Sequence, residues 1–448
     1  MSNETVVNFD YNGMVSSSCL SGEAKLLIYT DGLALDGLFD RVSVAYADIN
    51  SIALENHTVQ IITNGEIIVI SHLGQSCEWF HRDLLEAYNR KVLSSFYVTG
   101  EPVLETEGQY AYGVLNGNAK ISVFSDCLCI LSPNLRARRI PFVFINGIKR
   151  ENYTLAITLN TDEVYSFSML GSDIEPLERA IADHVRGQRS NDIAFVKKLM
   201  PSLGFAESTK AGALLREGIM VQLRQLPVML SEAIEEKVRN SKMGSTYEQL
   251  KTICDCECRA VGIKSLPDEE FEALKLIRIE KLNENAEANT KEAAEADMEA
   301  NTDAKMGRAA EVNVEKAAEL TAEQEDALRW AIWMAIPSKD GKTAVVEYSL
   351  PGEDAATFLF RADPVWERFL MLLNRGMEAA QMRREIFSLT DEALKEEVNS
   401  EQRMVKMRTP ALQELRKRFI GRVIHRSGES WKKSLIEKLG AMNDNGPY

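Results

Sequence analysis

Residues 24–37 read AKLLIYTDGLALDG, and residues 119–132 read AKISVFSDCLCILS. A second matching pair follows, because residues 46–62, YADINSIALENHTVQII, correspond to residues 142–158, FVFINGIKRENYTLAIT. The first pair is offset by 95 positions and the second by 96. Asp31 thus recurs as Asp126, and Ile49 recurs as Ile145. The N-terminal part of the chain therefore contains the same sequence motif twice, which predicts a tandem pair of domains.

Each copy has the pattern of short antiparallel strands followed by one helix. Apolar residues alternate with polar or small ones, and the dipeptides at 31–32 (Asp-Gly) and 64–65 (Asn-Gly) are typical of tight hairpins. At the end of the first copy the period changes, since Phe80, Leu84 and Tyr88 lie four apart on one helix face. We expect six or seven strands in each copy and a helix that covers them.

This pattern resembles the pleckstrin-homology-like superfold. The run Thr-Asp-Gly-Leu-Ala-Leu at 30–35 and the later strand at 46–52 are similar to the bacterial PH-like and GRAM-like domains. The resemblance implies two bent seven-stranded barrels, each closed by its C-terminal helix. It covers residues 1–190, and the second copy departs from it where Phe144 replaces Asp48 and Cys127 replaces Gly32.

The composition and the expected secondary structure change several times along the rest of the chain. The prediction is an α+β protein with PH-like domains at 1–97 and 98–190, followed by a helical region at 191–282. Residues 283–326 hold 13 acidic and 4 basic residues, which indicates a flexible acidic linker. Residues 327–448 are expected to form a small module of one hairpin and several helices. The hairpin of this module is followed by a helix that carries Trp366, as at the end of each PH-like copy. A third PH-like unit, split by the helical region and the linker, therefore stays open as an alternative.

Bulk composition limits the possible partners. The chain has 448 residues and a formal charge of −15, which disfavours nucleic acid and anionic membrane unless a local patch reverses the sign. The first residues lack a signal-peptide pattern, and no apolar run reaches the length of a membrane helix. We therefore expect a cytoplasmic protein.

No residue pattern indicates catalysis, a metal or a cofactor. Cys254, Cys256 and Cys258 form the densest cysteine group, but they lack the Cys-x-x-Cys spacing and nearby histidines of a zinc site. The five histidines show no ligand spacing, and no nucleophile elbow or phosphate-binding loop occurs. The prediction is a protein that is not an enzyme and has no cofactor.

Two basic features are candidate binding sites. The first lies in the second copy, where a phosphate or carboxylate group of a partner is the expected ligand; its residues are Arg136, Arg138, Arg139, Lys149 and Arg150. The second is an amphipathic segment, Arg403 to Lys438, with 11 basic residues and 3 Glu. We expect it to be a basic helix that docks on protein, carrying Arg416, Lys417, Arg418, Arg422 and Arg426.

These features favour a scaffold or adaptor that binds partner proteins through tandem PH-like domains. PH-like folds bind partners at an open barrel end and along strand edges, where backbone hydrogen bonds require no distinctive residues. Two alternatives stay open. One is a peripheral membrane protein that binds phosphorylated lipid headgroups, and the other is an accessory subunit of a multiprotein or nucleic-acid-associated machine.

Overall fold

The computed structural model describes residues 6–283, 320–350, 355–425 and 427–444. The chain forms two compact units, and each is made of more than one segment. Unit 1 comprises Met1–Ala194 and Val365–Phe419, and unit 2 comprises Phe195–Pro364 and Ile420–Tyr448. The two units are described separately below. No helix within the described ranges combines the length and apolarity needed to cross a membrane.

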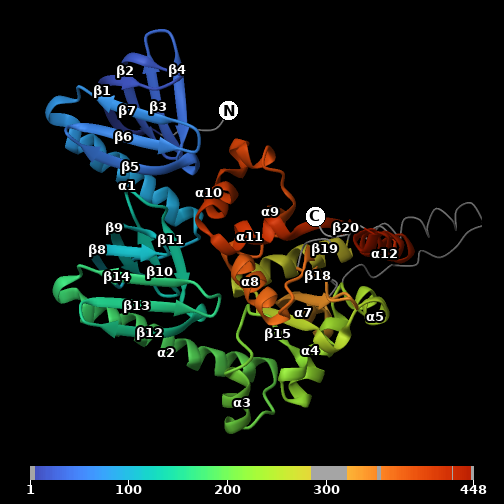
Figure 1. Ribbon diagram of the computed structural model, residues 1–448. Coiled ribbons are helices and arrows are strands. Elements are labelled where there is room, and N and C mark those ends of the chain that lie inside the picture. The colour runs from blue at the N-terminus through green and yellow to red at the C-terminus, as the bar shows by residue number, and fades with distance from the viewer. Residues whose placement is uncertain (1–5, 284–319, 351–354, 426, 445–448) are drawn as a thin grey trace, which may run out of the picture. The chain divides into compact units, whose positions relative to one another are not determined.

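The first copy of the repeat is a seven-stranded antiparallel sheet followed by a helix (Figure 1). The order of the strands in the sheet is β4-β3-β2-β1-β7-β6-β5. Its elements are β1 (Val6–Ser16), β2 (Ser21–Tyr29), β3 (Gly32–Gly37), β4 (Arg41–Ala45), η1 (Tyr46–Asp48), β5 (Ile49–Glu55), β6 (Thr58–Thr63), β7 (Ile67–Ser71), η2 (Gly74–Ser76) and α1 (Cys77–Ser95).

The second copy has the same strand order, β11-β10-β9-β8-β14-β13-β12, and also ends in a helix. Helix α2 continues past the end of unit 1 into unit 2. The elements are β8 (Leu104–Tyr112), β9 (Leu115–Val123), β10 (Cys127–Leu131), β11 (Arg138–Pro141), η3 (Phe142–Phe144), β12 (Ile145–Glu151), β13 (Thr154–Leu159), β14 (Val164–Ser168), η4 (Gly171–Asp173) and α2 (Ile174–Leu199).

The two copies match in strand register as well as in strand order. Gly13 pairs with Ala24 in the first copy, and Gly108 pairs with Ala119 in the second, so the offset of 95 is kept. A Cβ atom at Gly108 would lie 2.8 Å from the Ser168 carbonyl oxygen, which explains why this position has no side chain. The repeat seen in the sequence is therefore a repeat of structure.

The sequence predicted closed barrels, and the pairing differs from that prediction. The outermost strands, β4 and β5 in the first copy and β11 and β12 in the second, do not pair with each other among the described residues. The helices behave as expected, because α1 buries Phe80, Leu84 and Tyr88 almost completely. Each copy is thus an open seven-stranded sheet with a helix packed on it.

A helical segment from the C-terminal part of the chain completes unit 1. It begins at Val365 and ends at Phe419, so residues 327–448 do not form one module as predicted. The sequence could not show this, because the segment's partners lie more than 200 residues earlier in the chain. The segment contains α8 (Trp366–Ala379), α9 (Glu385–Ser388), η7 (Ala393–Lys395), η8 (Glu397–Asn399), α10 (Ser400–Arg408) and α11 (Pro410–Arg418).

Unit 2 is built on a six-stranded antiparallel sheet whose strands lie side by side in chain order. Helices from before and after the sheet strands share its hydrophobic core, which includes Leu230, Tyr247 and Trp431. Residues 268–283 are also helical. The named elements are α3 (Phe205–Gly212), β15 (Val221–Gln222), η5 (Leu223–Gln225), α4 (Val228–Asn240), α5 (Gly244–Ile253), η6 (Cys256–Cys258), β16 (Ala260–Ser265), α7 (Ala322–Arg329), β17 (Trp330–Pro337), β18 (Thr343–Ser349), β19 (Ala356–Arg361), β20 (Phe419–Ile424) and α12 (Gly428–Asp444).

Unit 2 corrects several sequence predictions. The region 191–282 is not wholly helical, because it supplies strands β15 and β16 to the sheet. The third sheet also lacks the strand order of the two copies, in which the first strand lies between the second and the seventh. Most of the predicted acidic linker, 283–326, lies outside the described residues. The described part of the chain begins again at residue 320, and a capping box formed by Thr321 and Gln324 starts α7 there.

Candidate functional site

The arginines that the sequence predicted as a ligand site are largely buried. Arg138 and Arg139 lie on β11 and are only 7% and 6% exposed. Arg138 donates a 2.6 Å hydrogen bond to the backbone carbonyl of Arg408. Arg136 donates 3.2 Å hydrogen bonds to the Asn50 side chain and to the Met407 carbonyl. These arginines bind other parts of unit 1.

Arg139 forms the most strongly charged contact of this group. It donates to Glu378 on α8 and, at 2.6 Å, to Asp126 beside β10. Burial alone would lower the pKa of the Arg139 guanidinium, but the neighbouring groups Glu378, Cys127 and Asp126 together outweigh it and hold that pKa above its usual value. Glu378 therefore occupies the position that a partner's carboxylate or phosphate would have to take.

A second buried arginine of α8 extends this ion-pair network. Arg375 is 3% exposed and lies 3.0 Å from Glu378 and 3.7 Å from Glu163 of the second copy. It also donates to the backbone carbonyl of Arg139, and its guanidinium lies 5.5 Å from the Phe144 ring centroid. Arg375 and Glu378 were not predicted from the sequence, because two arginines and two glutamates in one amphipathic helix form no distinctive signature.

In the first copy, the buried arginine that contacts the helical segment's side of the sheet is Arg408 of α10, which lies beside η1. Arg408 is 2% exposed, and it donates to the Ile49 carbonyl at 3.1 Å and to the Tyr88 hydroxyl at 2.8 Å. Nearby, Arg403 lies 3.3 Å from Asp48 in η1. One helical segment is therefore anchored to both copies, at η1 in the first and beside η3 in the second.

Lys149 and Arg150 do not belong to the arginine cluster. Both are on β12, where Lys149 pairs with Glu151 and Arg150 lies 3.1 Å from Glu175 and 3.3 Å from Glu178. These pairs are partly or largely exposed, so they contribute at most about 1 kcal/mol each to stability. The five predicted residues thus form two separate groups, and neither is a convergent cationic pocket.

The predicted basic helix, Arg403 to Lys438, is divided into two helices, a strand and a third helix. Arg416 in α11 donates to the Leu389 carbonyl at 2.6 Å and pairs with Asp391 at 2.9 Å. Lys417 and Arg418 pair with a glutamate one turn earlier in the same helix. Arg422 is on strand β20, and Arg426 lies outside the described residues. The prediction of one continuous docking helix is wrong.

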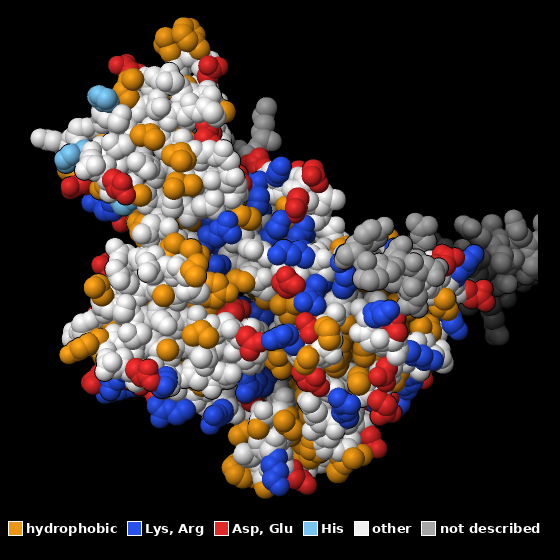
Figure 2. All heavy atoms as spheres, viewed as in Figure 1, with side chains coloured by type: hydrophobic (Ala, Val, Ile, Leu, Met, Phe, Trp, Pro, Cys, Tyr) orange, Lys and Arg blue, Asp and Glu red, His pale blue; other side chains and the backbone are white. Residues whose placement is uncertain are grey.

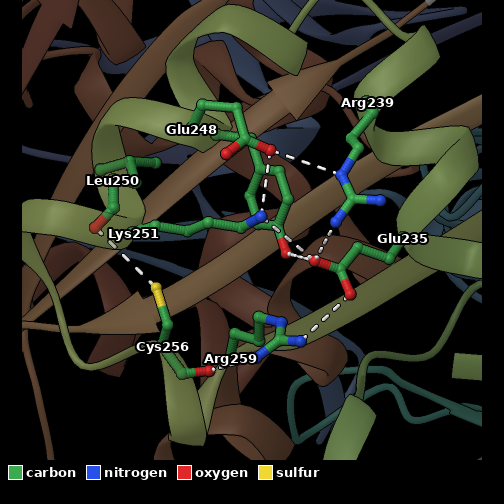
Figure 3. Close-up of polar contacts among 8 residues, drawn as sticks. Glu235, Arg239, Glu248, Leu250, Lys251, Cys256 and Arg259 are labelled. Atoms are coloured by element: carbon green, nitrogen blue, oxygen red, sulfur yellow. Dashed lines mark hydrogen bonds and ion pairs between the residues drawn. The ribbon is translucent and has the colours of Figure 1, made fainter. Parts of the chain in front are cut away.

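In unit 2, Glu235 of α4 is the centre of a polar cluster (Figure 3). Its carboxylate accepts a 2.5 Å hydrogen bond from the Tyr247 hydroxyl and lies 3.0 Å from Arg239, 3.3 Å from Lys251 and 3.2 Å from Arg259. Burial raises the pKa of Glu235, but these donors outweigh it and hold the pKa below its usual value of 4.5. The cluster ties α4, α5 and the start of β16 together.

The cysteine group lies beside this cluster. Cys254 is buried, whereas Cys256 and Cys258 are half-buried. Burial raises the pKa of the Cys254 thiol to about 12 and also raises that of Cys256, which disfavours the reactive thiolate. No group of three His, Cys, Asp or Glu side chains within the described ranges is placed to hold a metal ion.

A fully buried carboxylate, Glu347, sits in the middle of the third sheet. It accepts a 2.5 Å hydrogen bond from Thr357 and lies 2.9 Å from His425. Trp431 of α12 donates to Thr357 at 2.7 Å, which connects the last helix to the sheet. Because each partner comes from a different element, this network fixes α12 on unit 2.

Unit 1 leaves several large apolar side chains in contact with solvent. Figure 2 shows hydrophobic side chains on the outer surface of the first copy. They lie at the β3–β4 hairpin tip, on adjacent strands β6 and β7, and on α1; the residues are Leu38, Phe39, Ile62, Ile67 and Trp79, which are 39–90% exposed. Contiguous exposed apolar groups mark interaction surfaces, and Ile62 and Ile67 are direct neighbours on paired strands.

Comparisons with known proteins find similar chains among solved structures. No family model and no curated protein match it. It is similar to the solved C-terminal domain of an unknown protein from Leishmania infantum, with 10% identity, 23% of this chain and 98% of that chain covered, and a TM-score of 0.21. It is also similar to the Spt16D Pob3N heterodimer, with 15% identity, 34% and 82% covered, and a TM-score of 0.14. Functional proposals therefore rest on the residues of the chain itself.

Proposed function

We propose that this chain is a non-enzymatic adaptor that binds partner proteins through two PH-like domains. The observation that carries the proposal is the exposure of large apolar side chains on the first copy, with Phe39 90% and Trp79 56% exposed. Solvating such groups is unfavourable, and burying one of them in a complex contributes about 1.5–3 kcal/mol. Partner binding gives these side chains a role that folding alone does not.

The PH-like assignment is supported by the architecture of each copy. Seven antiparallel strands occur in the same order in both, and a helix follows the seventh strand directly. The cations that a lipid headgroup or nucleic acid would use point inward instead, since Arg138 and Arg139 are buried and paired. This arrangement favours protein partners over anionic lipid.

The test is purification of the tagged full-length chain from its native cells, with the co-purifying proteins quantified. We expect a stable protein complex that survives gel filtration. A variant with Ile62→Ser, Ile67→Ser and Trp79→Ser should recover less partner, because it removes exposed apolar contacts without opening the core. Val114→Ser, at a 98% exposed position of the second copy, is the matched control. A monomer recovered alone or only with membranes would contradict the proposal.

A further inference from the structure

One contact between the two copies joins the edge strand of one sheet to a strand connection of the other. Strand β5 is the last strand of the first sheet (Figure 1), and the amide of Ile52 on it donates a 2.6 Å hydrogen bond to the carbonyl of Pro133. Pro133 lies in the connection between β10 and β11 of the second copy. Arg136 of the same connection donates at 3.2 Å to the side-chain oxygen of Asn50 on β5. The chain itself shows how an edge strand and a connection of this repeat fit together.

The second copy carries an edge strand of the same kind. Strand β12 is the last strand of the second sheet and corresponds to β5. Ile148 pairs with Ile157 as Ile52 pairs with Ile61, so the amide of Ile148 also points away from the sheet. No backbone carbonyl of a described residue accepts from it. The Ile148 side chain is only half-buried, whereas Ile52, which the second copy contacts, is 1% exposed.

The first copy carries the matching connection, at residues 38–40 between β3 and β4. Leu38 corresponds to Pro133 at the offset of 95, and its carbonyl accepts no backbone hydrogen bond within the described ranges. Counted back from the fourth strand, where the offset is 96, Asp40 corresponds to Arg136. Leu38 is 85% and Phe39 90% exposed, and Asp40 is exposed as well. Each copy therefore presents the half of the contact that the other copy uses.

The hydrogen-bonding groups on these two halves complement each other. The amide nitrogen of Asn50 donates within the first copy, and its oxygen accepts from Arg136. Asn146, the counterpart of Asn50, has the opposite arrangement, because its oxygen accepts from Thr158 at 2.8 Å and its NH2 group remains as the donor. A donor on β12 requires an acceptor on the connection. Asp40 is an acceptor at the position where the other connection has a donor.

The charges on the two halves are also complementary. On β12, the largely exposed Lys149 stands where β5 has Ala53, and its ion pair with a glutamate of the same strand is exposed to solvent. An exposed pair of this kind exchanges partners at little cost. In the first copy, Asp36 and Arg41 pair with each other at 3.2 Å, which leaves the carboxylate of Asp40 without an ion pair among the described residues. The β12 edge therefore offers a cation and the β3–β4 connection a carboxylate.

We propose that two molecules of this chain bind head to tail, through the β3–β4 connection of one and the β12 edge of the other. The Leu38 carbonyl accepts from the Ile148 amide, and Asn146 and Lys149 donate to the carboxylate of Asp40. Each end of such a dimer keeps one connection or one edge free, so further molecules can add. This inference goes beyond the adaptor function and does not depend on it.

The test is sedimentation velocity of the purified full-length chain at increasing concentration. We expect the weight-average sedimentation coefficient to rise, because a small contact associates reversibly. The connection variant carries Phe39→Ser and Asp40→Lys, and the edge variant carries Ile148→Pro and Lys149→Glu. Proline on an edge strand removes an amide that points away from the sheet. Each variant should associate at least about tenfold more weakly than the unaltered chain.

An equal mixture of the two variants tests the head-to-tail arrangement directly. The connection variant keeps its edge and the edge variant keeps its connection, so the mixture should form a one-to-one complex and nothing larger. If two molecules associated through the same surface instead, one of the variants alone would still dimerise. Val114→Ser with Glu107→Lys makes the same kinds of change at exposed positions of β8 and the turn after it, and should leave association unchanged.

A sedimentation coefficient that stays at the monomer value at every soluble concentration would overturn the inference. Equal association of the unaltered chain and both variants would overturn it too. Thermal unfolding checks that the variants are folded, and Asn146→Asp with Lys149→Glu tests the same edge through side chains alone if Ile148→Pro destabilises the sheet. None of these results bears on the adaptor function, which is judged by the co-purification of other proteins.

Discussion

The two copies share a fold and are anchored to the same helical segment, but by different chemistry. In the first copy, the most deeply buried anchor, Arg408, donates to neutral acceptors, the Ile49 carbonyl and the Tyr88 hydroxyl, and the less buried Arg403 pairs with Asp48. In the second, Arg139 and Arg375 share the carboxylate of Glu378. The two copies keep the same strand order, whereas the side-chain contacts that they make with the helical segment differ. Breaking a buried ion pair costs more than removing a donor from neutral groups, so the two anchors should respond unequally to mutation.

Glu378→Ala should have the largest effect, because it leaves two buried arginines without their shared carboxylate. We expect a loss of about 3–5 kcal/mol in the free energy of unfolding, measured by urea denaturation of the full chain. Glu175→Ala is the control, since its pair with Arg150 is exposed and should contribute less than about 1 kcal/mol. Equal losses in both variants would show that the buried pair does not stabilise unit 1.

Arg408→Met should have a smaller effect, about 1–3 kcal/mol, because the partners it leaves unpaired are uncharged. Arg408→Lys should restore only part of the loss, since one ammonium group cannot reproduce the fork that reaches Ile49 and Tyr88. The same urea titration measures both. A loss for Arg408→Met larger than that for Glu378→Ala would reverse the comparison between the two anchors.

Glu235 should contribute a still smaller effect, on the acid stability of unit 2, beside Glu248 and Asp340, whose pKa values are also lowered. The pKa of Glu235 in the folded protein lies below its usual value of 4.5, so its contribution to stability is present above that pH and is lost as pH falls through the folded pKa. We expect the unfolding free energy to fall between about pH 5 and pH 3. Glu235→Gln should flatten this dependence; an unchanged slope would assign the acid response to other carboxylates.

The smallest expected difference between the two copies is in how readily their cysteine thiols react with an alkylating reagent. This difference involves no change in stability. Cys19 is exposed in the β1–β2 connection of the first copy, whereas Cys127 and Cys129 of the second are buried. The neighbouring Cys129 thiol and burial raise the pKa of the Cys127 thiol far above its usual range. Mass spectrometry after brief alkylation should find Cys19 modified and the other two unmodified. Early modification of Cys127 would indicate that the second copy opens.

The sequence predicted the two seven-stranded units because alternation, hairpin dipeptides and the repeat agree with one another. It failed where contacts join distant segments. Ala260–Ser265 is short and follows a helix, and it is a strand because it pairs with Val221–Gln222 on one side and Trp330–Pro337 on the other. Arg138 was recognised as a notable cation, but its acceptor is the Arg408 carbonyl, 270 residues away. No local spacing indicates whether such an arginine faces solvent or another part of the chain.

The return of Val365–Phe419 to unit 1 affects the order in which the protein can mature on the ribosome. When the second copy has been synthesised as far as Leu199, the end of α2, the Asp126 partner of Arg139 is present but Glu378 is still 179 residues from being added (378 − 199). Unit 2 likewise lacks β20 and α12 until the last residues emerge. Neither unit can complete its native contacts before its late segments, Val365–Phe419 for unit 1 and β20 with α12 for unit 2, have been synthesised. A chain that stops before them would present uncovered sheets and unpaired arginines to the cell's quality control.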